Sequence, residues 1–495
     1  MASASLVVTS DWSAASNVAA GSLTQYVKSY TITRGRSSEL DRVGPGTMTL
    51  VLDSPNGLFM PRSTTGSLSG SVLPGRLIKV DWTLSGSTYR RFYGRTVSYT
   101  PETDVSGKRE VVVQCVDVMD NFQRRETRST LYTNIPSGSL INNILDNAEF
   151  PAASSGSRFI DAGQDTYTFA YFDQRKIDEV LTDILKTEYG FGFIRGDGAY
   201  VFHDRFYRQL NSTASATFSE NMTDATFVRT IDDVYTEARV TTLPKVIKAS
   251  TTIWTIQSPV TISPSSTASW FGNYIDPMTC QLAAATTVAS PTINTSVAPG
   301  ILLNSNASGT GTNLSASLTA SFTAFAESFK IVASNAGNTT GYITTMTVTG
   351  CPIVTYENVA RSWLDRTACG LYGLRTLTYD ANLITDAEAG QGFAQFLVGR
   401  YSSPSNVDRV ALSIANGDTT DWQNILRRDL DSKISVTCAR LGLNAAGFFV
   451  GYLTENYNSL TGLHTVTYVL EGIGVDDQLF IVDVSIVNGT AQLAY

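Results

Sequence analysis

Residues 26–61 read YVKSYTITRGRSSELDRVGPGTMTLVLDSPNGLFMP, and this stretch decides the fold of the chain. Large apolar side chains alternate with Ser and Thr on both sides of a charged connector, which is the pattern of two half-buried β-strands. Tyr30 and Ile32 mark the inward face of the first strand, and Met48 marks that of the second. The stretch therefore predicts a β-hairpin, and the turn signal Ser-Pro-Asn-Gly follows it at 54–57.

The connector of this hairpin is highly charged and contains no recognisable catalytic set. Its charged residues are Arg34, Arg36, Glu39, Asp41 and Arg42. Charges at an interface set register and partner choice more than they set affinity. We therefore expect the connector to contact another subunit, together with Asp408 and Arg409, which occupy a similar Asp-Arg-Val context later in the chain.

The composition indicates a folded chain of several domains with few charges. The 495 residues allow roughly three or four domains, and 42% of them are hydrophobic. A net charge of −8 argues against a general nucleic-acid binder, which needs a basic surface, although clusters of arginine leave a DNA-facing lining open. Five widely spaced cysteines fit neither a zinc site nor a disulfide framework.

The sequence contains no recognisable membrane or export signal. No run reaches the ~18 consecutive apolar residues of a transmembrane helix. The first residues lack the basic and apolar regions of a signal peptide. We expect no membrane insertion by this chain and assembly in a host cytoplasm.

Changes of hydrophobic period divide the chain into four predicted domains, so that the fold class is mainly β with a smaller α+β part. Residues 1–125 alternate and predict a small β-barrel. Residues 126–248 combine two helical faces with a Gly-Asp-Gly hairpin, which predicts an α+β domain. Residues 249–355 are rich in Ser and Thr, nearly free of charge, and predict an inserted β-sandwich. Residues 356–495 predict a second β-barrel with a helix and a C-terminal tail.

The last predicted domain echoes the first. Segments 76–80, 92–95 and 108–115 resemble segments 433–436, 449–452 and 463–469 in kind and in order. The spacings agree, with 16 residues from Ile78 to Gly94 and 17 from Ile434 to Gly451. Chance similarity between β-hairpins is one interpretation, and a duplicated barrel is the other. With two barrels per chain, three copies can form a quasi-six-fold ring.

The chain carries little of the chemistry that catalysis needs. Its two histidines, His203 and His464, lie in predicted strands without a metalloprotease or serine-hydrolase motif around them. No phosphate-binding loop of the G-x-x-x-x-G-K-[ST] type occurs. The adjacent carboxylates at 232–233 and 476–477 would face opposite ways on a strand, but carboxylate pairs form in space, so a hydrolase stays open. We predict no enzyme, no catalytic residue, no cofactor and no metal site.

Several segments resemble minor tail proteins of long-tailed bacteriophages. The connector RGRSSELDR at 34–42 and the segment LVLDSPNGLF at 50–59 resemble the opening of these proteins. The segments VQCVD at 113–117, GYITTMTVTGCPI at 341–353 and 372–412 continue the likeness. It spans nearly the whole chain and depends on the order of the elements more than on any single motif.

The resemblance implies a structural hub at the tail tip or baseplate of a virion, similar to the central hub of contractile tails. Such a hub is a homotrimer with two barrels per chain, and it closes or lines the DNA channel, with transient contact to DNA. Its partners are the distal tail ring protein, the tail tube, the tape measure protein and the tip or fibre proteins. The inserted domain departs from a minimal hub. A receptor- or carbohydrate-binding tail protein is therefore the alternative, and a carboxylate-pair hydrolase is the third reading.

Overall fold

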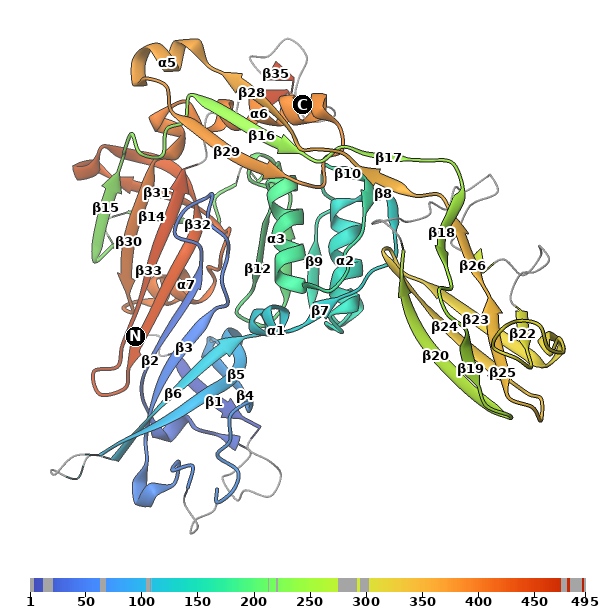
Figure 1. The fold of residues 1–495 in the computed structure, drawn as a ribbon. Helices are drawn as coiled ribbons and strands as arrows, with labels where there is room; N and C mark the ends of the chain where they lie inside the picture. Colours follow the sequence, from blue (N-terminus) through green and yellow to red (C-terminus); the bar gives the residue numbers. More distant parts are fainter. Residues whose placement is uncertain are drawn as a thin grey trace.

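The computed structural model describes residues 4–11, 21–62, 68–103, 107, 109–211, 213–219, 221–274, 292–293, 302–472, 479–480 and 492–493. The carboxylate pair at 476–477 and Cys280 lie outside these ranges. One large sheet stands on the left in Figure 1, helices and short strands fill the middle, and the inserted β elements form an arm on the right. The mainly β character with a smaller α+β part is as predicted.

The first half of the large sheet grows from the charged hairpin. In pairing order its strands are β1 (Ser5–Ser10), β4 (Leu77–Leu84), β5 (Ser87–Thr103), β6 (Arg109–Asp117), β3 (Thr47–Asp53) and β2 (Val27–Gly35). Tyr30, Ile32 and Met48 are buried, which confirms the inward face predicted from their alternation. Fully burying such a side chain stabilises the fold by about 1.5–3 kcal/mol.

The second half of the sheet comes mainly from the last part of the chain. In pairing order its strands are β14 (Ala216–Phe218), β31 (Lys433–Cys438), β32 (Leu443–Asn458), β33 (Leu463–Gly472), β30 (Arg409–Ala415) and β15 (Asp224–Val228). Helix α7 (Thr419–Leu426) connects β30 to β31 and begins at a capping box between Asp418 and Asp421. The edge strands β14 and β15 come from the segment that the sequence assigned to the α+β domain.

The two halves form one open sheet, so the prediction of two separate closed barrels is wrong. Strand β2 pairs antiparallel with β32, from Ser29 opposite Asn458 to Gly35 opposite Tyr452. The path of pairing then runs from β1 to β15 without closing. The physical reason is that β2 uses its outer edge to pair with β32, whereas a closed first barrel would need that edge to pair with β1.

Glycine is required where this seam ends. Gly35 has φ +107°, and a Cβ placed on it would lie 2.2 Å from the carbonyl oxygen of Gly451. The backbones of β2 and β32 therefore approach more closely than any side chain allows.

The two halves repeat the same order of pairing. The first half has the pairing order β4-β5-β6-β3, and the second half has the matching order β31-β32-β33-β30. In β5, Gly94 pairs with both neighbouring strands, and the register shifts three residues later, at Val97. In β32, Phe448 pairs with both neighbouring strands, and the register again shifts three residues later, at Gly451. The strand correspondences drawn from the sequence agree with this pairing. The sequence matched Gly94 with Gly451, whereas the pairing matches Gly94 with Phe448, three residues earlier. The error arose because composition does not fix register.

The α+β elements pack beside the sheet. Helices α2 (Ser137–Asn147) and α3 (Ile177–Glu188) bury the apolar faces that their period predicted, and α3 ends at Tyr189 in the left-handed region just before Gly190. Strands β12 (Phe191–Ile194) and β13 (Tyr200–His203) form the predicted hairpin, with β9 (Arg158–Ile160) beside them. The other elements of this region are α1 (Met119–Arg124), β7 (Glu126–Thr127), β8 (Tyr132–Pro136), β10 (Thr166–Ala170), β11 (Arg175–Lys176) and α4 (Tyr207–Leu210).

A small three-stranded sheet lies above these elements in Figure 1. It consists of β28 (Val359–Leu364), β16 (Glu237–Thr242) and β29 (Thr376–Ala381), with α5 (Arg366–Tyr372) between β28 and β29. Helix α6 (Ala387–Tyr401) packs on it through Phe393, Ala394 and Leu397. The helix predicted within residues 356–495 is thus present.

The insert leaves this region through the paired strands β17 (Lys245–Ile247) and β27 (Ile353–Thr355). Its further strands are β18 (Thr251–Thr255), β19 (Val260–Ile262), β20 (Ser266–Asn273), β21 (Thr292–Ile293), β22 (Leu302–Asn304), β23 (Leu318–Ala324), β24 (Ser328–Asn335), β25 (Gly341–Thr345) and β26 (Thr347–Gly350). They form three three-stranded sheets around a core of their own that includes Phe329 and Ile343. The four domain boundaries given above stay predictions.

Candidate functional site: the charged joint

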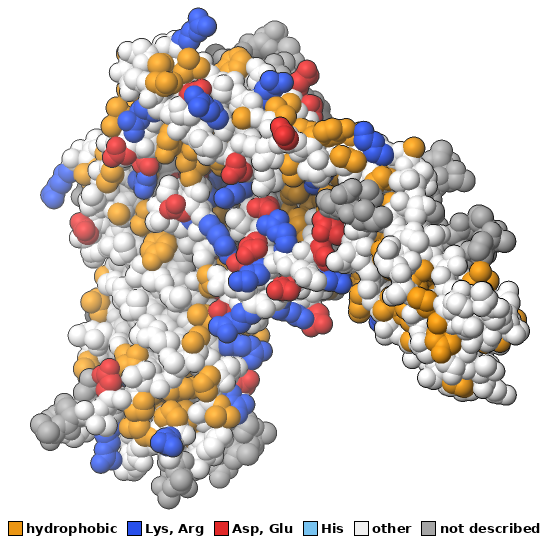
Figure 2. Space-filling model, viewed as in Figure 1, with side chains coloured by type: hydrophobic (Ala, Val, Ile, Leu, Met, Phe, Trp, Pro, Cys, Tyr) orange, Lys and Arg blue, Asp and Glu red, His pale blue; other side chains and the backbone are white. Residues whose placement is uncertain are grey.

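The connector after β2 lies where the large sheet, the α+β elements and α6 meet. A cavity of about 110 Å³ is lined there by connector residues 36 and 39–43 together with residues of α3, α4 and α6. Charged side chains gather over the middle of the molecule in Figure 2, whereas the visible face of the insert is nearly free of them. We call the central set Arg36, Glu39, Arg208, Arg400, Asp431 and Glu471 the charged joint.

Arg36 holds the connector against β33. Its Nε and Nη2 donate to the two carboxylate oxygens of Glu471, at 3.2 and 3.0 Å. Its guanidinium carbon lies 4.2 Å from the ring centroid of Phe191 in β12. A two-pronged ion pair of this kind fixes orientation as well as distance. Both side chains are buried, so the pair holds the connector to β33 from inside, and the contact with Phe191 adds the α+β elements.

Glu39 joins the connector to α6. It accepts hydrogen bonds from Arg400 Nη2 at 2.9 Å and from the hydroxyl of Tyr401 at 3.2 Å. Arg400 also donates to the carbonyl oxygens of Asn406 and Gly472, at 3.0 and 2.9 Å. One guanidinium therefore connects the helix, the connector and the end of β33.

Arg208 in α4 stands between the acidic members of the joint. Its Nε donates to Asp431 Oδ1 at 2.7 Å, and its Nη1 lies 2.7 Å from Glu471 Oε2. The Nδ1 atom of His203 lies 2.7 Å from the other oxygen of Asp431, and its ring stacks on Tyr207. His203 is thus held as a neighbour of a buried carboxylate.

The electrostatics of the joint keep two of its carboxylates, Glu471 and Asp431, ionised. Burial alone would raise the pKa of Glu471, but the guanidinium groups of Arg36 and Arg208 lower it to about 2. Burial likewise opposes the ionisation of Asp431, and Arg208 and His203 overcome it, so that the pKa of Asp431 lies below its ordinary value. Removing either partner of such a pair leaves a buried charge without compensation.

The remaining residues predicted for subunit contact also have partners within the chain. Arg34 is buried and donates to Asp429 at 2.6 Å. Arg42 pairs with Asp178 at the start of α3, and Asp41 accepts from the hydroxyl of Ser37. Asp408 pairs with Arg229 at 2.6 Å, and Arg409 pairs with Asp233. Asp41 and Arg42 keep the exposure that a contact between subunits needs, whereas Arg34 and Arg36 serve contacts inside the chain.

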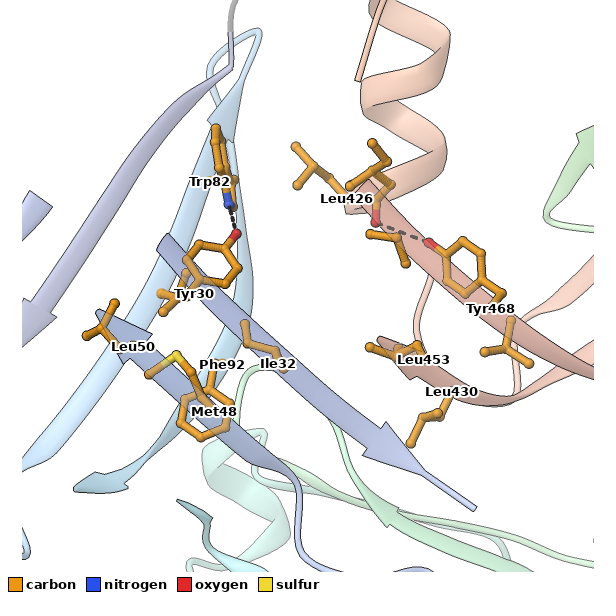
Figure 3. Close-up of a cluster of buried hydrophobic side chains, with 14 of the residues drawn as sticks. Tyr30, Ile32, Met48, Leu50, Trp82, Phe92, Leu426, Leu430, Leu453 and Tyr468 are labelled. Atoms are coloured by element: carbon orange, nitrogen blue, oxygen red, sulfur yellow. Dashed lines mark hydrogen bonds between the residues drawn. The ribbon is translucent and has the colours of Figure 1, made fainter. Parts of the chain in front are cut away.

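A second buried polar cluster lies at the seam of the large sheet. Glu455 of β32 accepts hydrogen bonds from the Tyr30 hydroxyl at 2.9 Å and from Arg91 Nε at 2.7 Å. The Nε2 atom of His464 lies 3.0 Å from Glu455 Oε1. Figure 3 shows Tyr30 accepting a hydrogen bond from Trp82, at 2.7 Å, on the side of the first half, and Tyr468 among the apolar residues of the second half. Burial opposes the ionisation of Glu455, but Arg91 holds its pKa well below the ordinary range. The cluster therefore ties one half of the sheet to the other.

These arrangements are suited to holding segments together. Asp232 and Asp233 do not form a poised carboxylate pair, because Asp233 is bound to Arg409 and Asp232 is 86% exposed. Within the described ranges, no three of His, Cys, Asp and Glu gather as a metal site would require. No helix in the part of the chain that the structure describes is long and apolar enough to cross a membrane.

The fold is similar to that of a prophage tail protein of solved structure. The 43 kDa tail protein of prophage MuSo2 from Shewanella oneidensis aligns with a TM-score of 0.51 at 8% identity, over 95% of this chain and 98% of that chain. A tail protein from Neisseria meningitidis MC58 aligns at 0.49 and 9% identity, over 95% and 96%. The prophage tail protein gp18 from Listeria monocytogenes EGD-e aligns at 0.41 and 7% identity, over 94% of both chains.

The fold assignment rests on the MuSo2 protein, and it confirms the resemblance to phage tail proteins that the sequence indicates. No protein-family model matches the chain, and no curated protein matches it in sequence.

Sequence reasoning missed the partners of the connector. Arg208, Arg400 and Glu471 lie far from the connector in sequence and belong to no motif. The sequence did contain one signal of the cluster at the seam. Glu455 lies two residues after Leu453, so the alternation of the strand places its acidic side chain on the inward face. An acidic residue at an inward position needs a buried partner.

Proposed function

We propose that this chain is a structural, non-enzymatic hub at the distal end of a phage tail. Three copies would form a quasi-six-fold ring around the channel for DNA. The hub would join the tail tube and distal ring protein to the tip or fibre proteins and contact the tape measure protein. The virion tail tip is then its place of action.

One observation supports the ring above the others. A single chain contains two half-sheets with the same strand order and the same position of the register shift. A trimer therefore presents six similar half-sheets, which suits contact with a six-fold tube on one side and three-fold symmetry on the other.

The copy number tests this proposal. We expect native mass spectrometry of the purified 53.4 kDa chain to give a trimer of about 160 kDa. Imaging of tails should place three copies at the distal end. A monomer or dimer in the assembled particle contradicts the hub, and six copies indicate a distal ring protein instead.

The insert favours a second candidate, a receptor- or carbohydrate-binding tail protein. Its core contains only its own residues, and it projects as an arm in Figure 1. Deleting the insert separates the two functions. Tails that assemble but no longer adsorb to cells support binding by the insert, whereas tails that fail to assemble support a role in the hub.

A further inference from the structure

Residues 365–375 leave the small upper sheet after β28 and return to it at β29. Both ends of this excursion are held by Thr236. The amide of Asp365 donates to the Thr236 carbonyl at 2.9 Å, and the amide of Arg375 donates to the Thr236 hydroxyl oxygen at 3.0 Å. The excursion is thus a fixed projection on a narrow base, which we call the knob. It contains α5 and lies at the upper edge of the molecule in Figure 1.

The knob exposes apolar side chains. Leu371 is 72% exposed and Leu374 is 63% exposed, and Trp363, in β28 just before the knob, is 38% exposed. Ala368 is the buried residue of α5. A helix of seven residues is marginal in water without packing, and clustered exposed apolar groups indicate a contact surface. The knob therefore lacks the cover that its side chains require.

A groove of matching character lies elsewhere on the same chain. It has a volume of about 380 Å³ and runs between β10 and the start of α6. Tyr167, Leu383 and Phe393, all buried, belong to its lining. The exposed carboxylates Asp386 and Glu388 line it as well. An apolar side chain of the size of leucine can enter it.

The net charges of the knob and the groove are opposite in sign: the knob contains Arg366 and Arg375 against Asp365, and the groove is lined by Asp165, Asp386 and Glu388 against Arg205. Arg366 lies in the knob and Arg361 precedes it in β28, and neither forms an ion pair with any residue that the structure describes. Asp386 and Glu388 likewise have no cationic partner among the described residues, although Asp386 caps α6 by accepting from the Glu388 amide. Complementary charges of this kind steer association and fix its register.

The placement of the two surfaces suits contact between copies. Strand β29 (Thr376–Ala381) begins at the base of the knob and ends just before Leu383 of the groove. Its six residues separate the two by roughly 20 Å at the rise of a strand. A chain with a knob at one end of a strand and a groove at the other can bind a copy of itself head to tail, and such contacts close into rings.

We propose that the knob, residues 365–375, docks into the groove between β10 and α6 of a second copy of this chain. Leu371 and Leu374 enter the groove, and Arg366 faces Asp386 and Glu388. This inference rests on the proposed trimer and assigns the surfaces that form it.

The test is the double variant Leu371→Asp, Leu374→Asp. The trimer should weaken by about 30-fold or more, since central apolar contacts contribute at that level. Native mass spectrometry over a dilution series measures it. The variant Leu460→Asp is the matched control, because Leu460 is 89% exposed on another hairpin. A trimer that is unaffected by the double variant overturns this contact and leaves the proposed hub standing. A wild-type chain that stays monomeric overturns both.

Cross-linking gives an independent measurement that does not depend on aspartate in the knob. Chains with Leu371→Cys and chains with Ala389→Cys, each also carrying Cys351→Ser, Cys369→Ser and Cys438→Ser to remove the partly exposed native thiols, are mixed and treated with a short bis-maleimide. We expect a covalent pair from the mixture and much less from either variant alone. Equal yields in all three samples contradict the contact.

Discussion

At the scale of single residues, the pair Arg36–Glu471 dominates the charged joint. Both side chains are buried and joined by two hydrogen bonds. We expect Arg36→Met to lower the free energy of unfolding by about 3–5 kcal/mol, because Glu471 then loses its main compensation. Urea unfolding measures the change. Arg124→Met is the control, since Arg124 pairs with Asp120 on an exposed helix face, and its free energy of unfolding should not change measurably. Equal losses in both variants would contradict a dominant joint.

Acid should weaken the joint in a defined window. The pKa of Glu471 is lowered to about 2 in the folded chain, below the ordinary value of 4.5. A carboxyl group whose pKa is lowered by folding stabilises the fold fully at a pH above its ordinary pKa. For Glu471 that stabilisation is lost as the pH falls from 4.5 towards 2. We expect the free energy of unfolding to fall over this range. The slope from this one proton is at most about 1.4 kcal/mol per pH unit.

The variant Glu471→Gln isolates that contribution. It should be less stable than the wild type at pH 7 and should depend less steeply on pH below about 4.5. Parallel curves for the two proteins would assign the acid sensitivity to other carboxylates, such as Glu455.

At the scale of elements, the seam between β2 and β32 depends on a close backbone approach. Gly35→Ala should destabilise the chain by about 1–3 kcal/mol, because its φ of +107° is strained for alanine and the Cβ would meet the Gly451 carbonyl. Gly399→Ala is the control. Gly399 lies in α6 with nothing within 4 Å of an added Cβ, so alanine should stabilise by about 0.5–1 kcal/mol. Thermal unfolding distinguishes the two, and equal effects would show that the seam tolerates a side chain.

Local elements were predictable from the sequence because their signals are local. Alternation at Tyr30 and Met48 identified two strands, and the helical period identified α2 and α3. The partner of β2 was not predictable, because a period of two specifies the inward face and leaves the neighbouring strand open. For the same reason the sequence suggested two closed barrels where one open sheet forms.

The candidate site was predicted in part. The sequence drew attention to the connector through its charge, and the connector does lie at the centre of a buried ionic network. Its partners Arg208 and Arg400 could not be found, since charged residues far apart in sequence carry no spacing rule that brings them together. The contact of the connector with another subunit stays a prediction.

At the scale of the whole molecule, we predict that the insert can be removed without unfolding the rest of the chain. Its core residues contact one another, and its ties to the body include the β17–β27 pair and a hydrogen bond from the Ala326 amide to the Ser129 carbonyl. Replacing residues 251–350 by a short Gly-Ser linker should therefore leave the rest folded. We expect the Tm of the body to change by less than ~3 °C, the shift that about 1 kcal/mol produces in a large domain. A body that no longer unfolds cooperatively in calorimetry would show that the insert completes its core.

The seam also sets an order of events during synthesis. Tyr30 of β2 pairs with Tyr457 of β32, and 425 residues separate Tyr30 from its hydrogen-bond partner Glu455. A ribosome adding about 5–20 residues per second needs about 20–85 s for that distance. During this interval the outer edge of β2 is an open strand edge, which invites pairing with other chains. We expect a chain that ends at residue 440 to associate through this edge, as light scattering would reveal, while the full chain closes it with its own last strands.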